Sequence, residues 1–111
     1  MTTLEKAIAT YGKDMQLTVA VEELSELIKE ICKSKRGADN RETIIEEVVD
    51  CYIMLEQIEI IFGMTELELW REKTKKLTRL EKRLEEAAET CVVCGDVIPE
   101  GRQVCPRCEE A

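Results

Sequence analysis

Two acidic segments in the first half of the chain have the residue types and the spacing of a divalent-cation site. Each carries two carboxylates three residues apart, Glu23 with Glu26 and Glu47 with Asp50. Acids with this spacing lie about one turn apart on one flank of a helix. A short turn at residues 37–39 predicts antiparallel neighbouring helices, with Glu26 level with Asp50. Four converging carboxylates repel one another unless a cation lies among them, and ligands that are all oxygen favour Mg²⁺ or Mn²⁺.

The two acidic pairs belong to a pattern that repeats after 24 residues, since the segment 22–27 is echoed by the segment 46–51. In both segments the acids border the apolar stripe of the helix and do not point directly away from it. A single pair of this kind is more often the solvated face of an acidic helix. Two pairs in matching positions on adjacent helices favour a metal site, with the solvated face as the alternative.

A second set of metal ligands lies near the C-terminus, where cysteines form two Cys-x-x-Cys pairs ten residues apart. The four are Cys91, Cys94, Cys105 and Cys108. Each pair can present two thiolates to one ion, and the turn residues at 98–101 predict a small hairpin that brings the pairs together. The pattern predicts a structural Cys₄ zinc site in residues 90–111, with iron as the alternative ion.

The role of this cysteine module is open between protein interaction and stabilisation of the chain. Its only bases are Arg102 and Arg107, with four acids nearby, so DNA recognition is disfavoured. A module this small cannot fold without its ion. The two remaining cysteines, Cys32 and Cys51, occur singly in helical segments, and each is expected to be a small packing residue.

The composition excludes several classes of function. The 111 residues include 24 acidic and 16 basic side chains, a net charge of -8 and no histidine. Without histidine there is no Ser-His-Asp triad, no Cys-His pair and no imidazole base. The acidic balance argues against a plain nucleic-acid binder. The sequence shows no signal peptide, and acids interrupt the apolar segment 44–62, so we expect a cytoplasmic protein that does not enter a membrane.

Helix signals predict an all-α fold for residues 1–89, an antiparallel bundle of about four helices, followed by the zinc-ribbon hairpin in 90–111. The expected helices cover residues 2–11, 14–35, 39–62 and 65–89. Their predicted caps are Thr2 with Glu5, Asp14, Asp39 with Glu42, and Thr65 with Glu68. The third helix is apolar nearly all round, which is typical of a helix that is central or shared with a partner chain. We therefore expect a homo-oligomer.

The acidic segments together form the pattern Glu22-Glu23-x-x-Glu26, about twenty residues, then Glu47-x-x-Asp50. This pattern and its apolar flanks, from about residue 11 to residue 83, resemble the MazG-like all-α nucleoside triphosphate pyrophosphatase superfamily. The resemblance implies a helical fold that forms dimers or tetramers. It also implies Mg²⁺-dependent hydrolysis of a nucleoside or deoxynucleoside triphosphate between the α- and β-phosphates, which yields the monophosphate and pyrophosphate.

The resemblance also assigns roles to residues by their position in the pattern. Four carboxylates become the Mg²⁺ ligands, and one of them, or Glu22, orients the attacking water. These ligands are Glu23, Glu26, Glu47 and Asp50. Bases on the fourth helix become candidates for contacts with the substrate phosphates, namely Lys73, Lys76 and Arg79. Some relatives have Asn or His in that region and this chain has neither, so a solvated face or a pair such as Glu72 with Lys76 is an equal alternative.

Two other functions compete with the pyrophosphohydrolase. The first is a non-catalytic helical oligomer that presents the zinc ribbon to a protein partner. The second keeps the fold and the metal site but binds nucleotide as a sensor. The convergence of acids across two helices favours the enzyme over the interaction protein, and Mg²⁺-dependent turnover separates the enzyme from the sensor.

Overall fold

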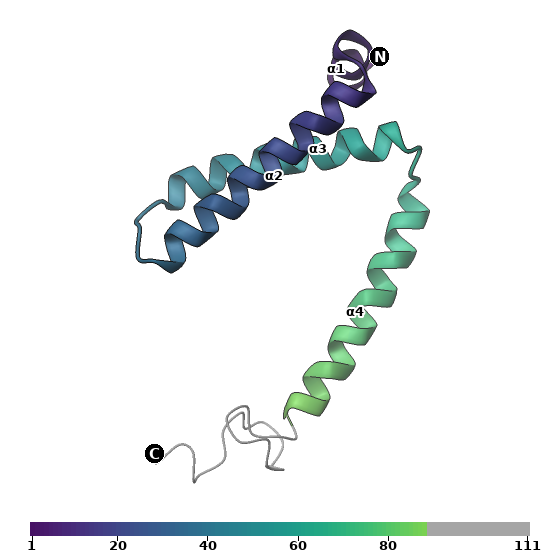
Figure 1. Ribbon diagram of the computed structural model, residues 1–111. Coiled ribbons are helices and arrows are strands. Elements are labelled where there is room, and N and C mark those ends of the chain that lie inside the picture. The colour runs from purple at the N-terminus through teal and green to yellow at the C-terminus, as the bar shows by residue number, and fades with distance from the viewer. Residues whose placement is uncertain (89–111) are drawn as a thin grey trace. The chain divides into compact units, whose positions relative to one another are not determined.

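The computed structural model describes residues 1–88 of the chain, which form four α-helices (Figure 1). They are α1 (Thr3–Tyr11), α2 (Lys13–Lys35), α3 (Arg41–Ile61) and α4 (Glu66–Ala88). No strand occurs among these residues, so the predicted all-α fold is confirmed for them. None of these helices has an apolar stretch long enough to cross a membrane. The predicted zinc ribbon and the boundary before it lie outside the described residues.

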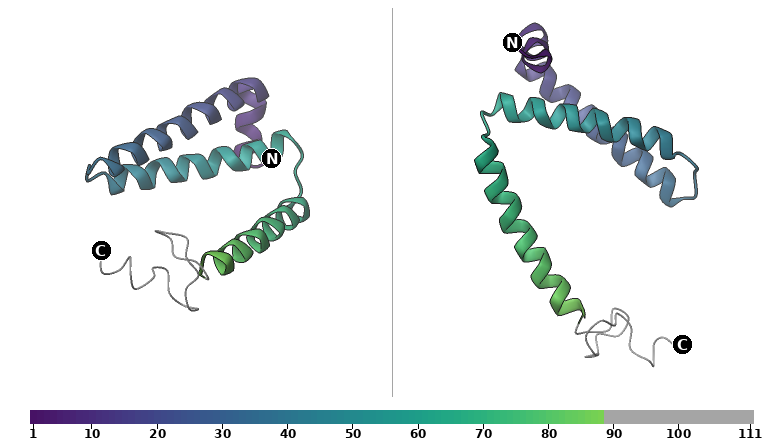
Figure 2. Two further views of the ribbon diagram at one scale, coloured as in Figure 1. Left: turned by 60° about the horizontal axis from the view of Figure 1, so that its bottom comes forward. Right: turned by 180° about the vertical axis from the view of Figure 1, so that it is seen from behind.

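The chain divides after Thr65 into two compact units. The first unit contains α1, α2 and α3. Within it, α2 and α3 run antiparallel and pack along most of their length, as predicted, and α1 packs against both (Figure 2). The described part of the second unit is the single helix α4.

The beginning of α1 follows the predicted capping box. The N–H of Glu5 donates to Oγ1 of Thr2 at 3.2 Å, and the N–H of Thr2 donates to the Glu5 carboxylate at 3.4 Å. Gly12 then joins α1 to α2 with a φ of +90°, which glycine adopts without the strain of a Cβ atom. The prediction that Asp14 caps α2 is wrong, because Gly12 occupies the capping position and no side chain caps this helix.

In the turn between α2 and α3, backbone N–H groups donate hydrogen bonds to carbonyl oxygens in the last turn of α2. Gly37 has a φ of +98°, and its N–H donates to the carbonyl oxygen of Ser34 at 2.9 Å. The N–H of Ala38 donates to the carbonyl oxygen of Lys33 at 3.1 Å. These bonds satisfy carbonyl groups that the end of a helix leaves without partners. The predicted end of α2 at this glycine is therefore confirmed.

The beginning of α3 differs from the expectation. The helix starts at Arg41, so Asn40 occupies the capping position and the predicted Asp39–Glu42 capping box is wrong. The Asn40 side chain does not cap α3 either, because it is hydrogen-bonded to α2. The end of α3 is as predicted, since the helix stops before Gly63, which has a left-handed φ of +62°.

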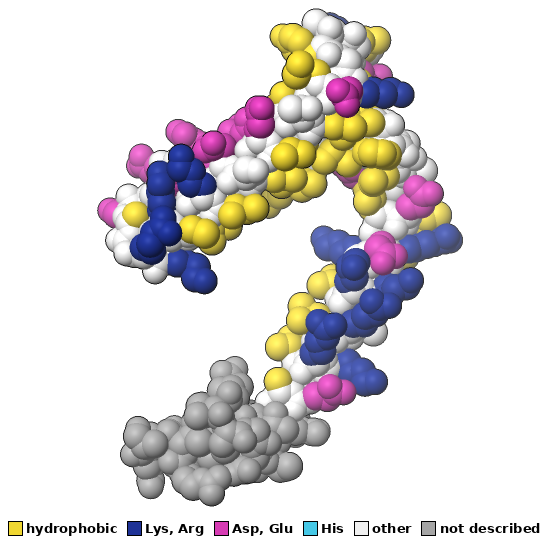
Figure 3. All heavy atoms as spheres, in the orientation of Figure 1, with side chains coloured by type: hydrophobic (Ala, Val, Ile, Leu, Met, Phe, Trp, Pro, Cys, Tyr) yellow, Lys and Arg dark blue, Asp and Glu magenta, His cyan; other side chains and the backbone are white. Residues whose placement is uncertain are grey.

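The core of the first unit is small. Its buried apolar residues are Ile8, Ala20, Cys51 and Met54. Two buried amides lie among them, where Nε2 of Gln16 donates to Oε1 of Gln57 at 2.6 Å. Figure 3 shows that hydrophobic side chains also form a band on the surface of α2 and α3, while acidic side chains gather along another edge of the pair. The unit therefore leaves a large part of its apolar surface exposed.

The helix α4 is strongly amphipathic and begins directly after Thr65, as predicted. Its exposed apolar residues include Trp70, Leu77, Leu80 and Leu84. On its polar face, Glu72 forms an ion pair of 3.8 Å with Lys75, whereas the alternative considered for the bases of this helix paired it with Lys76. Both partners are exposed to water, so this pair contributes little to stability.

Candidate metal centre

Three of the four predicted cation ligands come together between α2 and α3. One carboxylate oxygen from each of Glu23, Glu47 and Asp50 lies within 4.8 Å of the other two. Glu23 projects from α2, whereas Glu47 and Asp50 lie one turn apart on α3. The hydrogen bond from Sγ of Cys51 to the backbone oxygen of Glu23, at 3.5 Å, shows that the two helices meet at this level.

The fourth predicted ligand, Glu26, lies outside this group of oxygen atoms. The sequence predicts Glu26 level with Asp50, but Glu23 occupies that level instead, about one turn earlier on α2. The connecting residues 38–40 are not helical, and Asn40, directly before α3, already lies beside Glu30 of α2. The two helices are therefore displaced from the symmetric arrangement about the middle of the turn. Glu26 is nevertheless near enough for its negative charge to raise the pKa of Glu23 and of Glu47.

Burial and neighbouring negative charges raise the pKa values of Glu23, Glu47 and Cys51. Burial is the main cause that raises the pKa of Glu23, followed by the charge of Asp50 and a hydrogen bond with its side chain. Burial also raises the pKa of Glu47, followed by the charges of Asp50 and Glu23. The pKa of the Cys51 thiol is raised by burial and by the same acids, which favours the protonated thiol that donates to Glu23. Without a cation, the site therefore resists full ionisation.

One oxygen of this cluster lacks any partner in the structure. Oε2 of Glu47 is buried and accepts no hydrogen bond. No Lys or Arg among residues 1–88 forms an ion pair with Glu23, Glu47 or Asp50. A buried acceptor without a donor is costly, and an ionised one more so. A bound cation would satisfy this oxygen and neutralise the cluster.

The ligand chemistry indicates which cation fits. Carboxylate oxygens without nitrogen or sulfur ligands suit hard divalent ions such as Mg²⁺ and Mn²⁺. Mg²⁺ prefers six oxygen ligands and keeps several waters, so three carboxylates leave positions for water and for phosphate oxygens. The three carboxylates therefore provide part of the ligand set of such a cation and leave its other positions to oxygen atoms from outside the cluster.

The raised pKa values predict an unusual dependence of stability on pH. A carboxyl group whose pKa is higher in the folded state contributes stability at low pH, and this contribution is lost as the pH rises through the folded pKa. We therefore expect Glu23→Gln to raise the unfolding temperature of the cation-free protein at pH 7. The difference in unfolding temperature between Glu23→Gln and the wild-type protein should disappear below the ordinary glutamate pKa of about 4.3. At such a pH, Glu23 is protonated in both the folded and the unfolded state. Thermal unfolding in EDTA from pH 4 to pH 8 measures this.

Two comparisons make the stability experiment specific. Glu46→Gln removes an exposed acid outside the cluster and should leave the unfolding temperature nearly unchanged. Mg²⁺ at a hundred times its Kd should stabilise the wild-type protein by about 2.7 kcal/mol, and Glu23→Gln should lose most of this gain. A Glu23→Gln protein that is less stable than wild type in EDTA at pH 7 would contradict the description of the site.

The other predicted site residues lie apart from the cluster or beyond the described chain. Glu22 precedes Glu23 on α2 and is exposed. The three predicted phosphate contacts are exposed residues of α4 in the second unit, namely Lys73, Lys76 and Arg79. The four predicted zinc ligands, at positions 91, 94, 105 and 108, lie outside the described residues.

The polar contacts between α2 and α3 involve residues that belong to no recognised motif. Gln57 pairs with Gln16, and Asn40 binds Glu30 near the turn. The sequence indicates that two of these residues are buried, because Gln16 and Glu30 lie on the same face of the helix as the buried Ala20. A polar residue on a buried stripe needs a partner, although the stripe does not identify that partner.

The chain was compared with models of protein families, with curated proteins and with solved structures, and none of them matches it. Three converging carboxylates, one of them with a buried oxygen that lacks a partner, have the chemistry of a divalent-cation site.

Proposed function

We propose that the protein is a Mg²⁺-dependent nucleoside triphosphate pyrophosphohydrolase. It cleaves a nucleoside or deoxynucleoside triphosphate between the α- and β-phosphates and releases the monophosphate and pyrophosphate. The observation that carries the proposal is the convergence of Glu23, Glu47 and Asp50 around a buried oxygen without a partner. The resemblance of the acidic pattern to the MazG-like superfamily supports the choice of this reaction.

The carboxylates have distinct tasks in this proposal. Glu23, Glu47 and Asp50 hold the cation between α2 and α3, and Glu26 adds negative charge from the next turn of α2. When bound, Mg²⁺ lowers the pKa of a coordinated water and neutralises charge on the phosphates. One of these acids, or the exposed Glu22, orients the attacking water. Lys73, Lys76 and Arg79 of α4 are the proposed contacts for the substrate phosphates.

A panel of nucleotides tests this function directly. The purified protein is incubated with ribo- and deoxynucleoside triphosphates, with and without Mg²⁺, and pyrophosphate and monophosphate are measured. We expect both products in equal amounts, only with Mg²⁺ or Mn²⁺. No turnover across the panel, from a protein with its helices and zinc intact, would favour the non-catalytic oligomer that presents a zinc ribbon. Tight nucleotide binding without turnover would favour the sensor.

We also propose that the protein is a homodimer or a homotetramer, because many large apolar side chains of the first unit are exposed, which is typical of a surface that a partner covers. On α2, Val21 is 64% exposed and Ile28 is 63% exposed, and Tyr52 on α3 is 63% exposed. Light scattering should give a mass of two or four chains of 12.7 kDa. Ile28→Glu, which adds a charge to this surface, should lower that mass, while Glu46→Gln should not. A monomeric wild-type protein would contradict the proposal.

The second metal site in the proposal is the cysteine module. Cys91, Cys94, Cys105 and Cys108 are proposed to hold one structural zinc ion, because two Cys-x-x-Cys pairs at this spacing provide the four thiolates of a closed tetrahedral site. Such a site has no open position for substrate. Its proposed role is therefore to stabilise the C-terminal module or to present it to a protein partner.

A further inference from the structure

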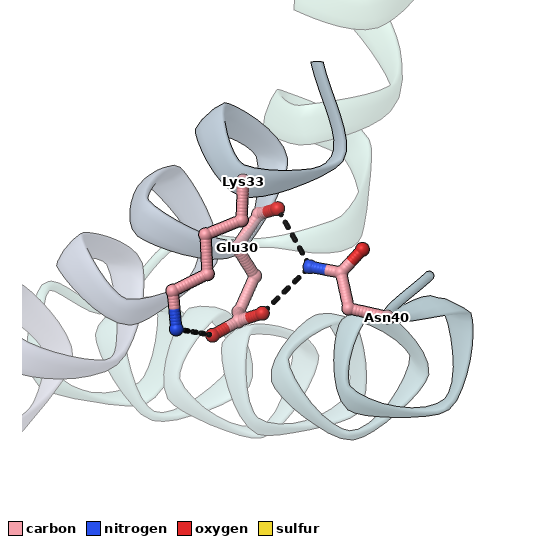
Figure 4. Close-up of polar contacts among 3 residues, drawn as sticks. All are labelled: Glu30, Lys33 and Asn40. Carbon is pink, nitrogen blue, oxygen red and sulfur yellow. Dashed lines mark hydrogen bonds and ion pairs between the residues drawn. The ribbon is translucent and has the colours of Figure 1, made fainter. Parts of the chain in front are cut away.

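Three polar side chains are in contact where α2 ends and α3 begins, and one of them, Asn40, connects to Glu30 of α2 (Figure 4). Nδ2 of Asn40 donates to the carboxylate Oε2 of Glu30 at 2.7 Å and to the backbone oxygen of Glu30 at 2.9 Å. The other carboxylate oxygen of Glu30 accepts from Nζ of Lys33 at 3.2 Å. Glu30 is only 7% exposed, so both of its carboxylate oxygens are engaged in a largely buried place. We call the contact between Asn40 and Glu30 the clasp.

Because Asn40 takes part in the clasp, the beginning of α3 has no side-chain cap. An asparagine directly before a helix usually accepts a hydrogen bond from the first turn of that helix, which stabilises it by about 1 kcal/mol. Asn40 makes no such bond, and its Oδ1 is buried without a partner. Local stability alone therefore does not explain the orientation of this side chain. The side chain is directed instead at Glu30 of α2.

The clasp lies at a fixed distance from the acidic cluster on both helices. Glu30 follows Glu23 by seven residues on α2, and Asn40, directly before α3, precedes Glu47 by seven residues. Seven residues are about two helical turns, or about 10 Å, so the clasp and the cluster face the same side of each helix. The charge of Glu30 contributes to the raised pKa of Glu47, which agrees with this placement.

We infer that Asn40 and Glu30 are positioning residues that set the register of α2 against α3 and thereby bring Glu23 to Glu47 and Asp50. The inference rests on the proposed function, in which these acids hold the cation. Apolar contacts do not specify register strongly, because they are not directional and only a few apolar side chains are buried here. A slip of one turn would move Glu23 by about 5 Å along α3 and separate the ligands.

Asn40→Asp tests the inference with almost no change in side-chain volume. It replaces the donating amide by a second carboxylate, which faces Glu30. An added negative charge near the cluster would by itself strengthen cation binding, so weaker binding indicates displaced ligands. The companion variant Asn40→Asp with Glu30→Gln exchanges the amide and the carboxylate and restores one hydrogen bond. Ile8→Ala serves as the control, because it removes a buried side chain of α1 and destabilises the unit without touching the clasp.

Mn²⁺ affinity is measured by electron paramagnetic resonance on the full chain, at a temperature where every variant is folded. We expect Asn40→Asp to weaken Mn²⁺ binding at least about tenfold, as for other residues that orient metal ligands. The exchanged pair should recover most of this loss, and Ile8→Ala should change the affinity by no more than about twofold. Unchanged affinity in Asn40→Asp, or an equal loss in Ile8→Ala, would overturn the inference.

A second readout needs no cation and separates this inference from the proposed function. Nuclear Overhauser effects between Gln16 and Gln57, and between Glu23 and Cys51, report the register of α2 against α3. If the wild-type protein binds no Mn²⁺, the proposed metal site is wrong. The nuclear Overhauser effects then still show whether the register of α2 against α3 depends on the clasp. Their loss in Asn40→Asp and return in the exchanged pair would support the clasp as the register-setting contact. Their persistence in Asn40→Asp would overturn it.

Discussion

Glu47→Gln is expected to abolish the Mg²⁺-dependent release of pyrophosphate and to leave the helices intact. The substitution removes the charge of a proposed cation ligand and changes the side-chain volume very little. Glu47 is the most informative position, because its Oε2 is buried without a partner in the cluster. A correctly held cation contributes several kcal/mol to transition-state stabilisation, so the expected loss in turnover is about a thousandfold or more. Pyrophosphate release and circular dichroism together measure this.

The neighbouring residue provides a matched control for Glu47→Gln. Glu46 is exposed and lies outside the cluster, so Glu46→Gln should keep nearly full turnover. Glu26→Gln adds a finer test, because Glu26 contributes charge but lies outside the group of converging oxygens. Its loss of turnover should be smaller than that of Glu47→Gln. Retained turnover in Glu47→Gln would mean that the active site is assigned wrongly.

Cys94→Ser is expected to remove the zinc ion from the protein. A closed Cys₄ site binds zinc with an apparent free energy of about 10–16 kcal/mol, and the loss of one thiolate weakens a tetrahedral site severely. Metal analysis of the wild-type protein should find one zinc per chain, and of Cys94→Ser much less than one. Cys32→Ser is the control, since Cys32 is an exposed cysteine of α2 outside the two pairs. A full equivalent of zinc in Cys94→Ser would contradict the proposed site.

Removal of residues 91–111 tests whether the zinc module takes part in catalysis. The acidic cluster is built entirely from α2 and α3, so the truncated chain should keep its Mg²⁺-dependent turnover. Circular dichroism of the truncated chain should show the helices of the first unit unchanged. Loss of all turnover with unchanged helicity would show instead that the module shapes the substrate site.

Local sequence signals predicted the helices and most of their ends. The Thr2–Glu5 capping box, the glycine after α2 and Gly63 after α3 each act within a few residues, so their effect is encoded in the segment itself. The signals failed at the beginnings of α2 and α3, where other residues occupy the capping positions. At Asn40 the reason is tertiary, because its side chain forms hydrogen bonds with α2.

The sequence by itself determined that acidic residues occupy one flank of each of two adjacent helices, since this follows from a spacing of three residues. Only the tertiary structure decided which acids meet. Glu23 joins Glu47 and Asp50 while Glu26 lies outside, in a register in which Asn40, directly before α3, binds Glu30 of α2. Helical periodicity specifies the face of a residue, whereas the register between two helices depends on contacts between residues far apart in the chain.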